Sequence, residues 1–180
     1  MAKGVPAIVL AAGASSRLGQ PKALVKWKDE SLVSRSIRIL SESGCSPIIV
    51  VTRSELQVDV MLECNGAIVV VNPSPEEGRT GSLQIGLVSL MSELGRTPRR
   101  VLVSPVDRCG WNLDTVNVLM ECHENTSPSP SGHPLMLCEV EKILSLPKDA
   151  SLRDSITISK ISAPGEHMNI DTSADLEGLQ

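Results

Sequence analysis

The stretch LAAGASSRLGQPK, Leu10–Lys22, continues the apolar run Ala7–Ala12 into a turn of small residues that carries one arginine and one lysine. Its glycines and basic side chains are those of a phosphate-binding turn. Five residues separate Gly13 from Gly19, whereas only four separate the two glycines of the P-loop motif, G-x-x-x-x-G-K-[ST]. In the P-loop, Lys and then Ser or Thr follow the second glycine, but here Gln and Pro follow it. The dinucleotide fingerprint G-x-G-x-x-G does not fit either. The stretch therefore excludes a Walker-type ATPase and a standard NAD site.

Short apolar runs alternate with longer amphipathic segments in the first part of the chain. The expected strands are Ala7–Ala12, Pro47–Thr52, Ala67–Val71 and Arg100–Ser104. The expected helices are Ser31–Ser43, Ser54–Cys64 and Gly81–Leu94, which end close to Gly44, Gly66 and Gly95. Nearly continuous apolar strands are typical of a parallel sheet that helices cover on both faces. The alternation predicts an α/β fold with a Rossmann-like, three-layer, open and mostly parallel sheet.

The second part of the chain is less regular. Beyond Asp107 we expect a helix over Asn112–Glu124, a Ser/Pro-rich loop over Asn125–Gly132, a strand over Pro134–Val140, a helix near Ser151–Ile156 and a closing segment, Asn169–Leu179. The loop has the composition of a linker, but only 48 residues follow it. We therefore expect the tail to return to the same sheet, and residues 1–180 to form one domain.

Composition narrows the class of protein. Of the 180 residues 41% are hydrophobic and 21% charged, and none is Phe or Tyr, so the core must be aliphatic. A net charge of -4 argues against nonspecific binding to nucleic acid or to an anionic membrane. The five cysteines include no C-x-x-C pair, which favours a reducing compartment, and no leader-like or membrane-spanning apolar run occurs. We expect a cytoplasmic protein that acts on small molecules.

Polar segments follow the expected strands at the edge of the sheet where ligands bind in open α/β folds. They are Gly13–Lys22, Asn72–Ser82, Ser104–Asp107 and, near the end of the chain, Asn169–Asp171. Gly13 and the small residues after it let backbone N–H groups approach a triphosphate, while Arg17 offers a planar fork and Lys22 a point charge. These groups suit a site that positions a phosphorylated substrate and neutralises its charge.

Five segments together resemble the MobA-like nucleotidyltransferases and, within them, the molybdenum cofactor cytidylyltransferases. LAAGASSRLGQPKAL is similar to the signature L-A-A-G-x-S-x-R-x-G-x-x-K, and NPSPEEGRTGSLQIGL to N-P-x-x-x-x-G-x-x-x-S-L-x-x-G-L. LVSPVD, GHPLML and NIDTSADLEGL resemble the family's remaining segments in the same order. The resemblance implies a fold of the nucleotide-diphospho-sugar transferase type. It also implies a Mg²⁺-dependent transfer from CTP to molybdopterin, with release of pyrophosphate.

The resemblance further implies roles for individual residues. It makes Arg17 and Lys22 the catalytic cations, Asp107 and Asp171 the Mg²⁺ ligands with Asn169 in reserve, and His133 an acceptor-binding residue. The implied nucleotide-binding residues are Leu10, Ala11, Ala12, Gly13, Ser15, Gly78, Gly81 and Ser82. The LAAG form of the turn, in place of LAGG, points to CTP over GTP, although relatives that use UTP share it. A molybdoenzyme or its chaperone is the implied protein partner.

The charged residues also have structural interpretations. Arg17 and Lys22 can face solvent from a strand-to-helix turn, as an isolated glycine-rich turn often does. Asp107 can be a helix cap or a turn residue before Asn112. Asp171 and Asp175 both lie beside an expected helix start, where either can be only a cap.

The remaining residues have structural interpretations as well. Gly78, Gly81 and Ser82 can serve to open the helix Gly81–Leu94, and His133 can be an exposed loop histidine. Four residues have the side chains of a zinc site, but their spacing matches no standard structural pattern. They are Cys122, His123, His133 and Cys138.

Departures from the family pattern lie on the acceptor side. Arg108, Cys109 and Gly110 follow Asp107 where the family has one residue and then Pro, and Leu137 replaces the Phe of G-H-P-V-L-F. Three interpretations stay open. The chain is a CTP:molybdopterin cytidylyltransferase, a cytidylyl- or uridylyltransferase for another phosphomonoester such as a sugar or polyol phosphate, or a non-catalytic carrier of molybdopterin or nucleotide. The cations and carboxylates speak against the carrier, which needs no such set.

Overall fold

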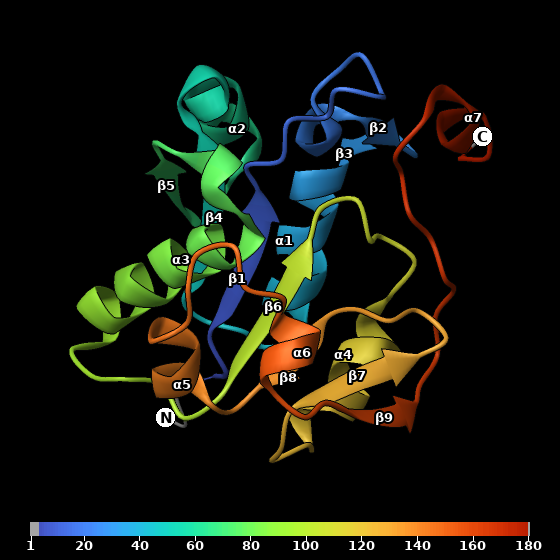
Figure 1. The fold of residues 1–180 in the computed structure, drawn as a ribbon. Helices are drawn as coiled ribbons and strands as arrows, with labels where there is room; N and C mark the ends of the chain where they lie inside the picture. Colours follow the sequence, from blue (N-terminus) through green and yellow to red (C-terminus); the bar gives the residue numbers. More distant parts are fainter. Residues whose placement is uncertain (1–3, 180) are drawn as a thin grey trace.

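A seven-stranded mixed sheet forms the centre of the fold in the computed structural model, which describes residues 4–179 (Figure 1). Its strand order is β5-β4-β1-β6-β8-β7-β9. The strands are β1 (Ala7–Ala11), β4 (Ile48–Arg53), β5 (Ile68–Asn72), β6 (Val101–Pro105), β7 (Thr126–Ser129), β8 (Leu135–Leu137) and β9 (Ser159–Ser162). β8 is antiparallel to both neighbours, and the other neighbouring pairs are parallel. The predicted open, mostly parallel sheet is confirmed. Residues 1–3 and 180 of the predicted domain lie outside the described part.

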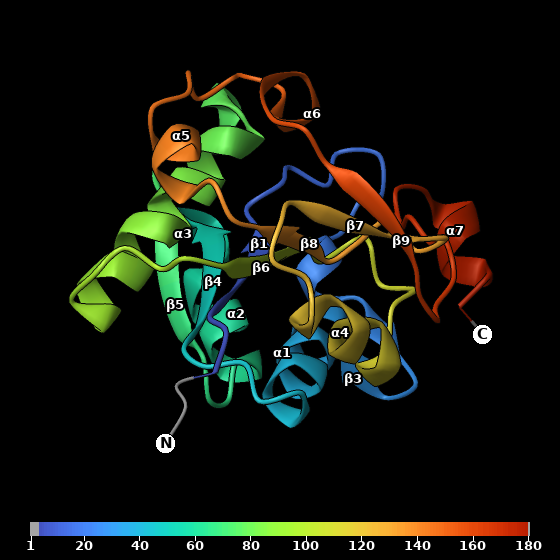
Figure 2. The ribbon, with the colours of Figure 1, turned by 90° about the horizontal axis from the view of Figure 1, so that it is seen from below.

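Helices cover both faces of the sheet and complete the three predicted layers (Figure 2). One face carries α1 (Leu32–Glu42), α2 (Gln57–Glu63) and α4 (Leu113–Met120). The other carries α3 (Arg79–Leu94), α5 (Val140–Leu144) and α6 (Leu152–Ser155). Each face of the sheet packs against its helices in a hydrophobic core. Within β1, Val9 belongs to the core under α1, α2 and α4, and Ile8 to the core under α3, α5 and α6, and both residues are fully buried. No helix within residues 4–179 combines the length and the apolar character needed to cross a membrane.

Local sequence sets the limits of the main helices. The hydroxyl of Ser31 accepts a hydrogen bond from the backbone N–H of Ser34 (3.2 Å) and so caps the start of α1. Gly95 ends α3 in the left-handed conformation. Within α3, a Cβ on Gly86 would lie 2.9 Å from Cγ2 of Ile8, so glycine lets this helix approach the sheet closely. This packing fixes α3 against β1, whose carboxyl end borders the site described below.

The segment Asn125–Gly132, predicted as a loop, contains strand β7, which is a correction. β7 pairs along its length with β9 but meets β8 only through Thr126 and Met136. Pro128 lacks the backbone N–H that a strand bonded on both sides requires. The short pairing with β8 accommodates this proline. Its polar, proline-containing sequence gives β7 no apolar periodicity by which to predict it.

Other boundaries also differ from the predictions. The strand predicted over Pro134–Val140 is limited to β8. The last residue of the predicted strand, Val140, is instead the first residue of α5. The helix predicted over Asn112–Glu124 ends at Met120, where α4 stops. The helix predicted over Ser54–Cys64 begins with a 3₁₀ turn before α2. The unpredicted elements include β9, α5 and a hairpin of β2 (Lys26–Trp27) and β3 (Glu30–Ser31).

The tail returns from β9 to the end of β6 and then forms α7 (Ser173–Glu177). The backbone N–H of Glu166 donates to the carbonyl of Gly110 (2.8 Å), and that of Ile170 donates to the carbonyl of Asp107 (2.9 Å). A Cβ on Gly110 would lie 2.0 Å from the carbonyl oxygen of Glu166, so glycine is required for this contact. The predicted return of the tail to the same sheet is confirmed by β8 and β9, which both belong to it.

Candidate active site

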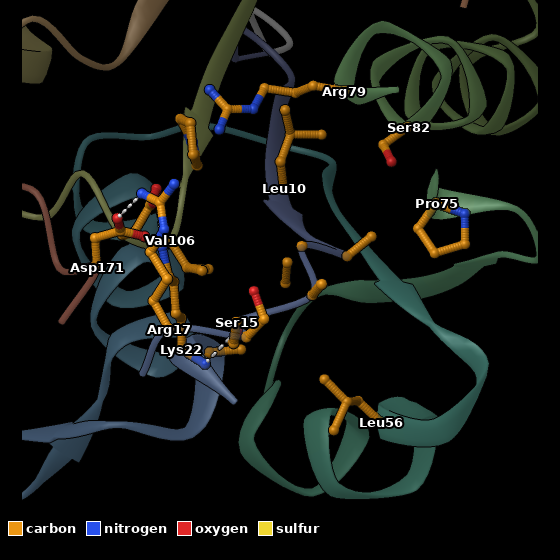
Figure 3. A pocket seen from close by; sticks show the side chains of 18 residues that line it. Leu10, Ser15, Arg17, Lys22, Leu56, Pro75, Arg79, Ser82, Val106 and Asp171 are labelled. Atoms are coloured by element: carbon orange, nitrogen blue, oxygen red, sulfur yellow. Dashed lines mark hydrogen bonds and ion pairs between the residues drawn. The ribbon is translucent and has the colours of Figure 1, made fainter. Parts of the chain in front are cut away.

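The turn after β1 borders a cleft of about 330 Å³ at the carboxyl end of the sheet (Figure 3). The predicted residues Leu10, Ala11, Ala12, Gly13 and Ser15 all line it. Ser15 adopts a φ of 55°, and its hydroxyl accepts a hydrogen bond from the backbone N–H of Lys22 (3.1 Å). This bond closes the turn and fixes the lysine at the edge of the cleft. A Cβ on Gly13 would meet no atom within 4 Å, so the turn leaves room there for a ligand.

Two cations and two carboxylates meet at one side of the cleft. Nζ of Lys22 lies 3.1 Å from Oδ2 of Asp107 and 2.8 Å from Oδ1 of Asp171. Nη1 of Arg17 lies 2.8 Å from Oδ2 of Asp171 (Figure 3). The side chains of Lys22 and Asp107 are 15% and 13% exposed, whereas Arg17 is 76% exposed. The structure therefore brings together the four charged residues that the sequence singled out, with Arg17 at the solvent side.

Hydrogen bonds between Lys22 and Asp171 keep both of these side chains ionised. Burial lowers the pKa of Lys22, but its hydrogen bonds to Asp171 and Asp107 outweigh burial and raise that pKa above its ordinary value. The hydrogen bonds from Lys22 and Arg17 lower the pKa of Asp171 below its ordinary value. At neutral pH the lysine is therefore an ammonium and Asp171 a carboxylate.

The two carboxylates form a donor set that fits a divalent metal ion. Asp107 and Asp171 each reach one atom, Nζ of Lys22, so their oxygens converge on a common position. Mg²⁺ commonly takes one or two carboxylates and completes its shell with water and substrate phosphates. Within residues 4–179 no group of three or more His, Cys, Asp or Glu side chains is placed to hold a metal ion. A metal held by the two aspartates would therefore take its other ligands from water and substrate.

The two closing aspartates make different contacts. Oδ2 of Asp175 accepts hydrogen bonds from the backbone N–H groups of Asp171 (2.9 Å) and Thr172 (2.7 Å) and caps α7. The carboxylate of Asp171 instead faces the two cations. The cap of α4 is Asn112, so Asp107 does not have the capping role that was its alternative. The capping interpretation thus describes Asp175 and not the two aspartates of the cleft.

The residues at the start of α3 divide into two groups. Ser82 lines the cleft, and its hydroxyl accepts a hydrogen bond from Nδ2 of Asn72 (2.9 Å). Gly78 has a φ of 130°, and a Cβ there would lie 2.4 Å from the carbonyl oxygen of Lys148. The N–H of Gly81 donates to the same carbonyl (3.1 Å). Neither glycine is among the lining residues of the cleft, so this geometry supports their role in packing and not the predicted contact with nucleotide.

His133 lies in a second cavity of about 420 Å³, which adjoins the cleft through Leu10, Arg79 and Pro105. Burial, together with the nearby charges of Arg108 and Arg79, lowers the pKa of His133 to about 4. Nδ1 of this histidine is buried and has no hydrogen-bond partner within residues 4–179. His133 is therefore not the exposed loop residue of the alternative interpretation. It lies beside the cleft and is neutral at pH 7.

The predicted site residues and the residues that line the two cavities differ at several positions. Asn169 is exposed and belongs to the lining of neither cavity. Sequence reasoning missed cavity residues that include Leu56, Pro75, Arg79, Val106 and Arg153. The first three follow the second or third strand, so the rule that ligands bind beyond strand ends could have found them. Arg153 lies on the short helix α6, and no sequence signal connects it with the site.

Comparison with protein families gives one match over most of the chain. The model of the MobA-like NTP transferase domain matches residues 7–155. The molybdenum cofactor cytidylyltransferase of Escherichia coli is 25% identical over 175 residues, which is 93% of this chain and 85% of that protein. The nicotine blue oxidoreductase of Paenarthrobacter nicotinovorans is 30% identical over 148 residues, 74% of this chain and 70% of that protein.

Two further curated relatives align over shorter segments. The bifunctional IPC transferase and DIPP synthase of Thermococcus kodakarensis is 37% identical over 84 residues, or 44% of this chain. A probable molybdenum cofactor guanylyltransferase of Opitutus terrae is 37% identical over 59 residues, or 33% of this chain. The alignments span 19% and 29% of the lengths of these two proteins.

Solved structures share the fold at low sequence identity. A Mycobacterium tuberculosis protein in complex with manganese superimposes with a TM-score of 0.77 at 17% identity, covering 98% of this chain and 97% of that one. The 4-diphosphocytidyl-2C-methyl-D-erythritol synthase of Anaerococcus prevotii gives a TM-score of 0.69 at 14% identity, covering 98% and 94%. Both span the whole sheet, including the part that sequence reasoning described poorly.

Proposed function

We propose that this chain, which belongs to the MobA-like NTP transferase family, transfers a cytidylyl group from CTP to the phosphate of a molybdopterin-type acceptor. It is a nucleotidyltransferase of the MobA type. The observation that carries the finer proposal is the meeting of two cations of the turn with Asp107 and Asp171 at the cleft. The Escherichia coli relative, which aligns with 93% of this chain, supports the choice of CTP and of the acceptor.

In the proposed reaction an acceptor phosphate oxygen attacks the α-phosphorus of CTP. The bond from that phosphorus to the bridging oxygen breaks, and pyrophosphate leaves. An ionised phosphate is already a nucleophile, so the chain needs no general base. Its contribution is to hold the triphosphate against the turn and to offset the charge on the phosphate oxygens with Lys22 and Arg17.

Asp107 and Asp171 would hold the metal ion, for which we propose Mg²⁺. When bound, such an ion neutralises and orients phosphate oxygens. The chain fixes the two carboxylates through its backbone, because Ile170, next to Asp171, donates a hydrogen bond to the carbonyl of Asp107 (2.9 Å). The manganese complex of the Mycobacterium tuberculosis neighbour supports metal binding on this fold.

The second cavity is the proposed acceptor site. It shares Leu10, Arg79 and Pro105 with the cleft, so a molecule in it can direct a phosphate toward bound nucleotide. His133 is neutral there and offers a buried nitrogen without a partner in residues 4–179 to a polar group of the acceptor. This arrangement takes residues 1–180 as one domain that contains both substrate sites.

Release of pyrophosphate from each of the four NTPs, with Mg²⁺ and with or without molybdopterin, tests the proposal. We expect release from CTP that depends on molybdopterin. Release from CTP or UTP with a sugar or polyol phosphate, and none with molybdopterin, would favour another phosphomonoester. Tight binding of molybdopterin without turnover of any NTP would favour the non-catalytic carrier.

The relative named nicotine blue oxidoreductase suggests a second candidate function, because it aligns with 74% of the chain. In a redox reaction the cleft would hold the diphosphate of a nicotinamide dinucleotide by a turn that lacks the standard dinucleotide fingerprint, and a metal at Asp107 and Asp171 would not be needed. Absorbance of NADPH and NADH in the presence of quinone-type dyes tests this candidate. Oxidation that persists in Asp107→Asn would favour it over nucleotidyl transfer.

A further inference from the structure

Three arginines from different parts of the chain line the second cavity. Arg79 begins α3, Arg108 follows β6, and Arg153 lies on α6. Figure 3 shows the side chain of Arg79 reaching across the end of β1, past Leu10, toward β6. None of the three forms a salt bridge with a carboxylate of residues 4–179. The cavity therefore gathers positive charge that the described chain leaves unpaired.

The environment of His133 shows that these charges converge. Burial is the largest cause of its low pKa, and Arg108, Arg79 and Arg153 each lower it further. The acidic group that opposes them is Asp107, whose Oδ2 already accepts a hydrogen bond from Lys22. The three guanidinium groups thus act on one position in the cavity, and the carboxylate of Asp107, which opposes them there, is hydrogen-bonded to Lys22.

An accumulation of arginines without counter-charge is typical of a site for anions. The guanidinium group presents a planar fork that matches phosphate and carboxylate. The chain as a whole carries a net charge of -4, so an excess of basic residues does not explain the cluster. Arg153 also lines a recess beyond His133 together with Lys160, which extends the positive surface away from the cleft.

We propose that the acceptor carries two anionic groups: a phosphate that reaches the cleft beside Arg79, and a second anionic group that Arg108 and Arg153 hold beside His133. This inference rests on the proposed function, because it assigns the chemistry of the acceptor site. The positions of the arginines support this placement of the phosphate near the cleft and of the second anionic group farther into the second cavity. Arg79 lines both cavities, whereas Arg108 and Arg153 line the second and not the first.

Two small probes with the same three-carbon skeleton test the inference. Glycerol 3-phosphate carries one anionic group, and 3-phosphoglycerate carries a phosphate and a carboxylate. Their binding to the full chain is measured by calorimetry with Mg²⁺ and saturating α,β-methylene-CTP, which fills the cleft and cannot transfer its nucleotide. We expect 3-phosphoglycerate to bind about tenfold more tightly, as a charge-assisted hydrogen bond to a second anionic group would produce.

Arg153→Gln should abolish the preference for 3-phosphoglycerate without changing the affinity for α,β-methylene-CTP, because Arg153 is remote from the cleft lining. Arg108→Gln is the second variant and should have the same effect. Arg99→Gln is the matched control, since Arg99 is exposed and lines neither cavity, and it should keep the preference. Equal binding of the two probes to the unmodified chain, or an unchanged preference in both Arg153→Gln and Arg108→Gln, would overturn the inference.

The nucleotide measurement separates this inference from the proposed function. If α,β-methylene-CTP does not bind, the proposed use of CTP fails. The two probes are then compared without nucleotide, in the unmodified chain and in the same variants. A preference that depends on Arg153 would still support the two-anion site, and its absence would overturn it.

Discussion

The two sides of the sheet build their cavities in different ways. On the β5-β4-β1-β6 side, site residues lie in the segments that follow buried apolar strands, as Lys22 does in the turn after β1 and Asp107 after β6. On the β8-β7-β9 side, the cavity is lined by residues such as His133 and Arg153, which lie in a loop and on a four-residue helix. Turns after regular strands thus form much of the proposed nucleotide cleft, whereas the proposed acceptor cavity combines residues of β1, β6 and α3 with residues of irregular segments held by tertiary contacts. Asp171 connects the two sides of the sheet, because the tail that follows β9 brings this residue to the cleft.

The largest expected effect concerns the carboxylates that join the two sides. Asp107→Asn and Asp171→Asn should each lower Mg²⁺-dependent turnover by several kcal/mol in the activation free energy, or about 10³-fold, because an anionic metal ligand is lost. Steady-state release of pyrophosphate at saturating CTP measures this. Both variants should fold normally by circular dichroism.

Asp175→Asn is the matched control in the same segment. Its carboxylate completes the capping box of α7 by accepting hydrogen bonds from the backbone N–H groups of Asp171 and Thr172, and the amide oxygen of Asn can still accept there, so activity and stability should change little. Full activity of Asp171→Asn would refute its metal role and leave Asp107 standing. The tail would then belong only to the acceptor side.

The next effect concerns the nucleotide side alone. Lys22→Ala removes a preorganised positive charge from the cleft and should lower kcat by about 10²-fold or more, while the fold survives. Lys142→Ala is the control, because that side chain is 51% exposed on α5, away from the cleft. Single-turnover kinetics separates loss of catalysis from loss of binding. Near-normal turnover in Lys22→Ala would show that the lysine has only the structural role of pairing the aspartates.

The same division explains what the sequence could predict. The four strands from Ala7–Ala12 to Arg100–Ser104 are continuous apolar runs, so their order and the polar segments after them could be read from residue types. Strand β7 could not be predicted in this way, because its sequence, a threonine, two serines and Pro128, has no apolar periodicity. The family resemblance implies nucleotide-binding roles for Gly78 and Gly81. Their contact with Lys148, far along the chain, appears only in the folded protein.

A smaller effect tests the burial of the acceptor side. The pKa of His133 is about 4 in the folded chain against an ordinary value of 6.5. As pH falls below 6.5 the unfolded chain binds a proton at this histidine that the folded chain takes up only near pH 4. The folded state should therefore lose about 2 kcal/mol of stability from this group at pH 5.

Urea unfolding of the unmodified chain and of His133→Gln at pH 7 and pH 5 measures the effect. The loss of stability between the two pH values should be smaller in His133→Gln. His123→Gln, at an exposed position, should keep the pH dependence of the unmodified chain. Identical pH dependence in all three proteins would show that His133 is not buried as described, and the acceptor cavity would lose its neutral histidine.

The smallest effect concerns the choice of nucleotide and sharpens the role of the turn. With Mg²⁺, CTP should bind about tenfold more tightly than GTP, as the LAAG form of the turn indicates. Ala12→Gly creates the LAGG form and removes a methyl group that lines the cleft, so it should reduce this preference by opening room near the nucleotide. Ala14→Gly makes the same chemical change in the same turn but leaves LAAG intact, and it should keep the preference. Calorimetry with both nucleotides measures the three proteins. Equal or tighter binding of GTP to the unmodified chain would end the CTP assignment, and an unchanged preference in Ala12→Gly would show that groups outside the turn choose the base.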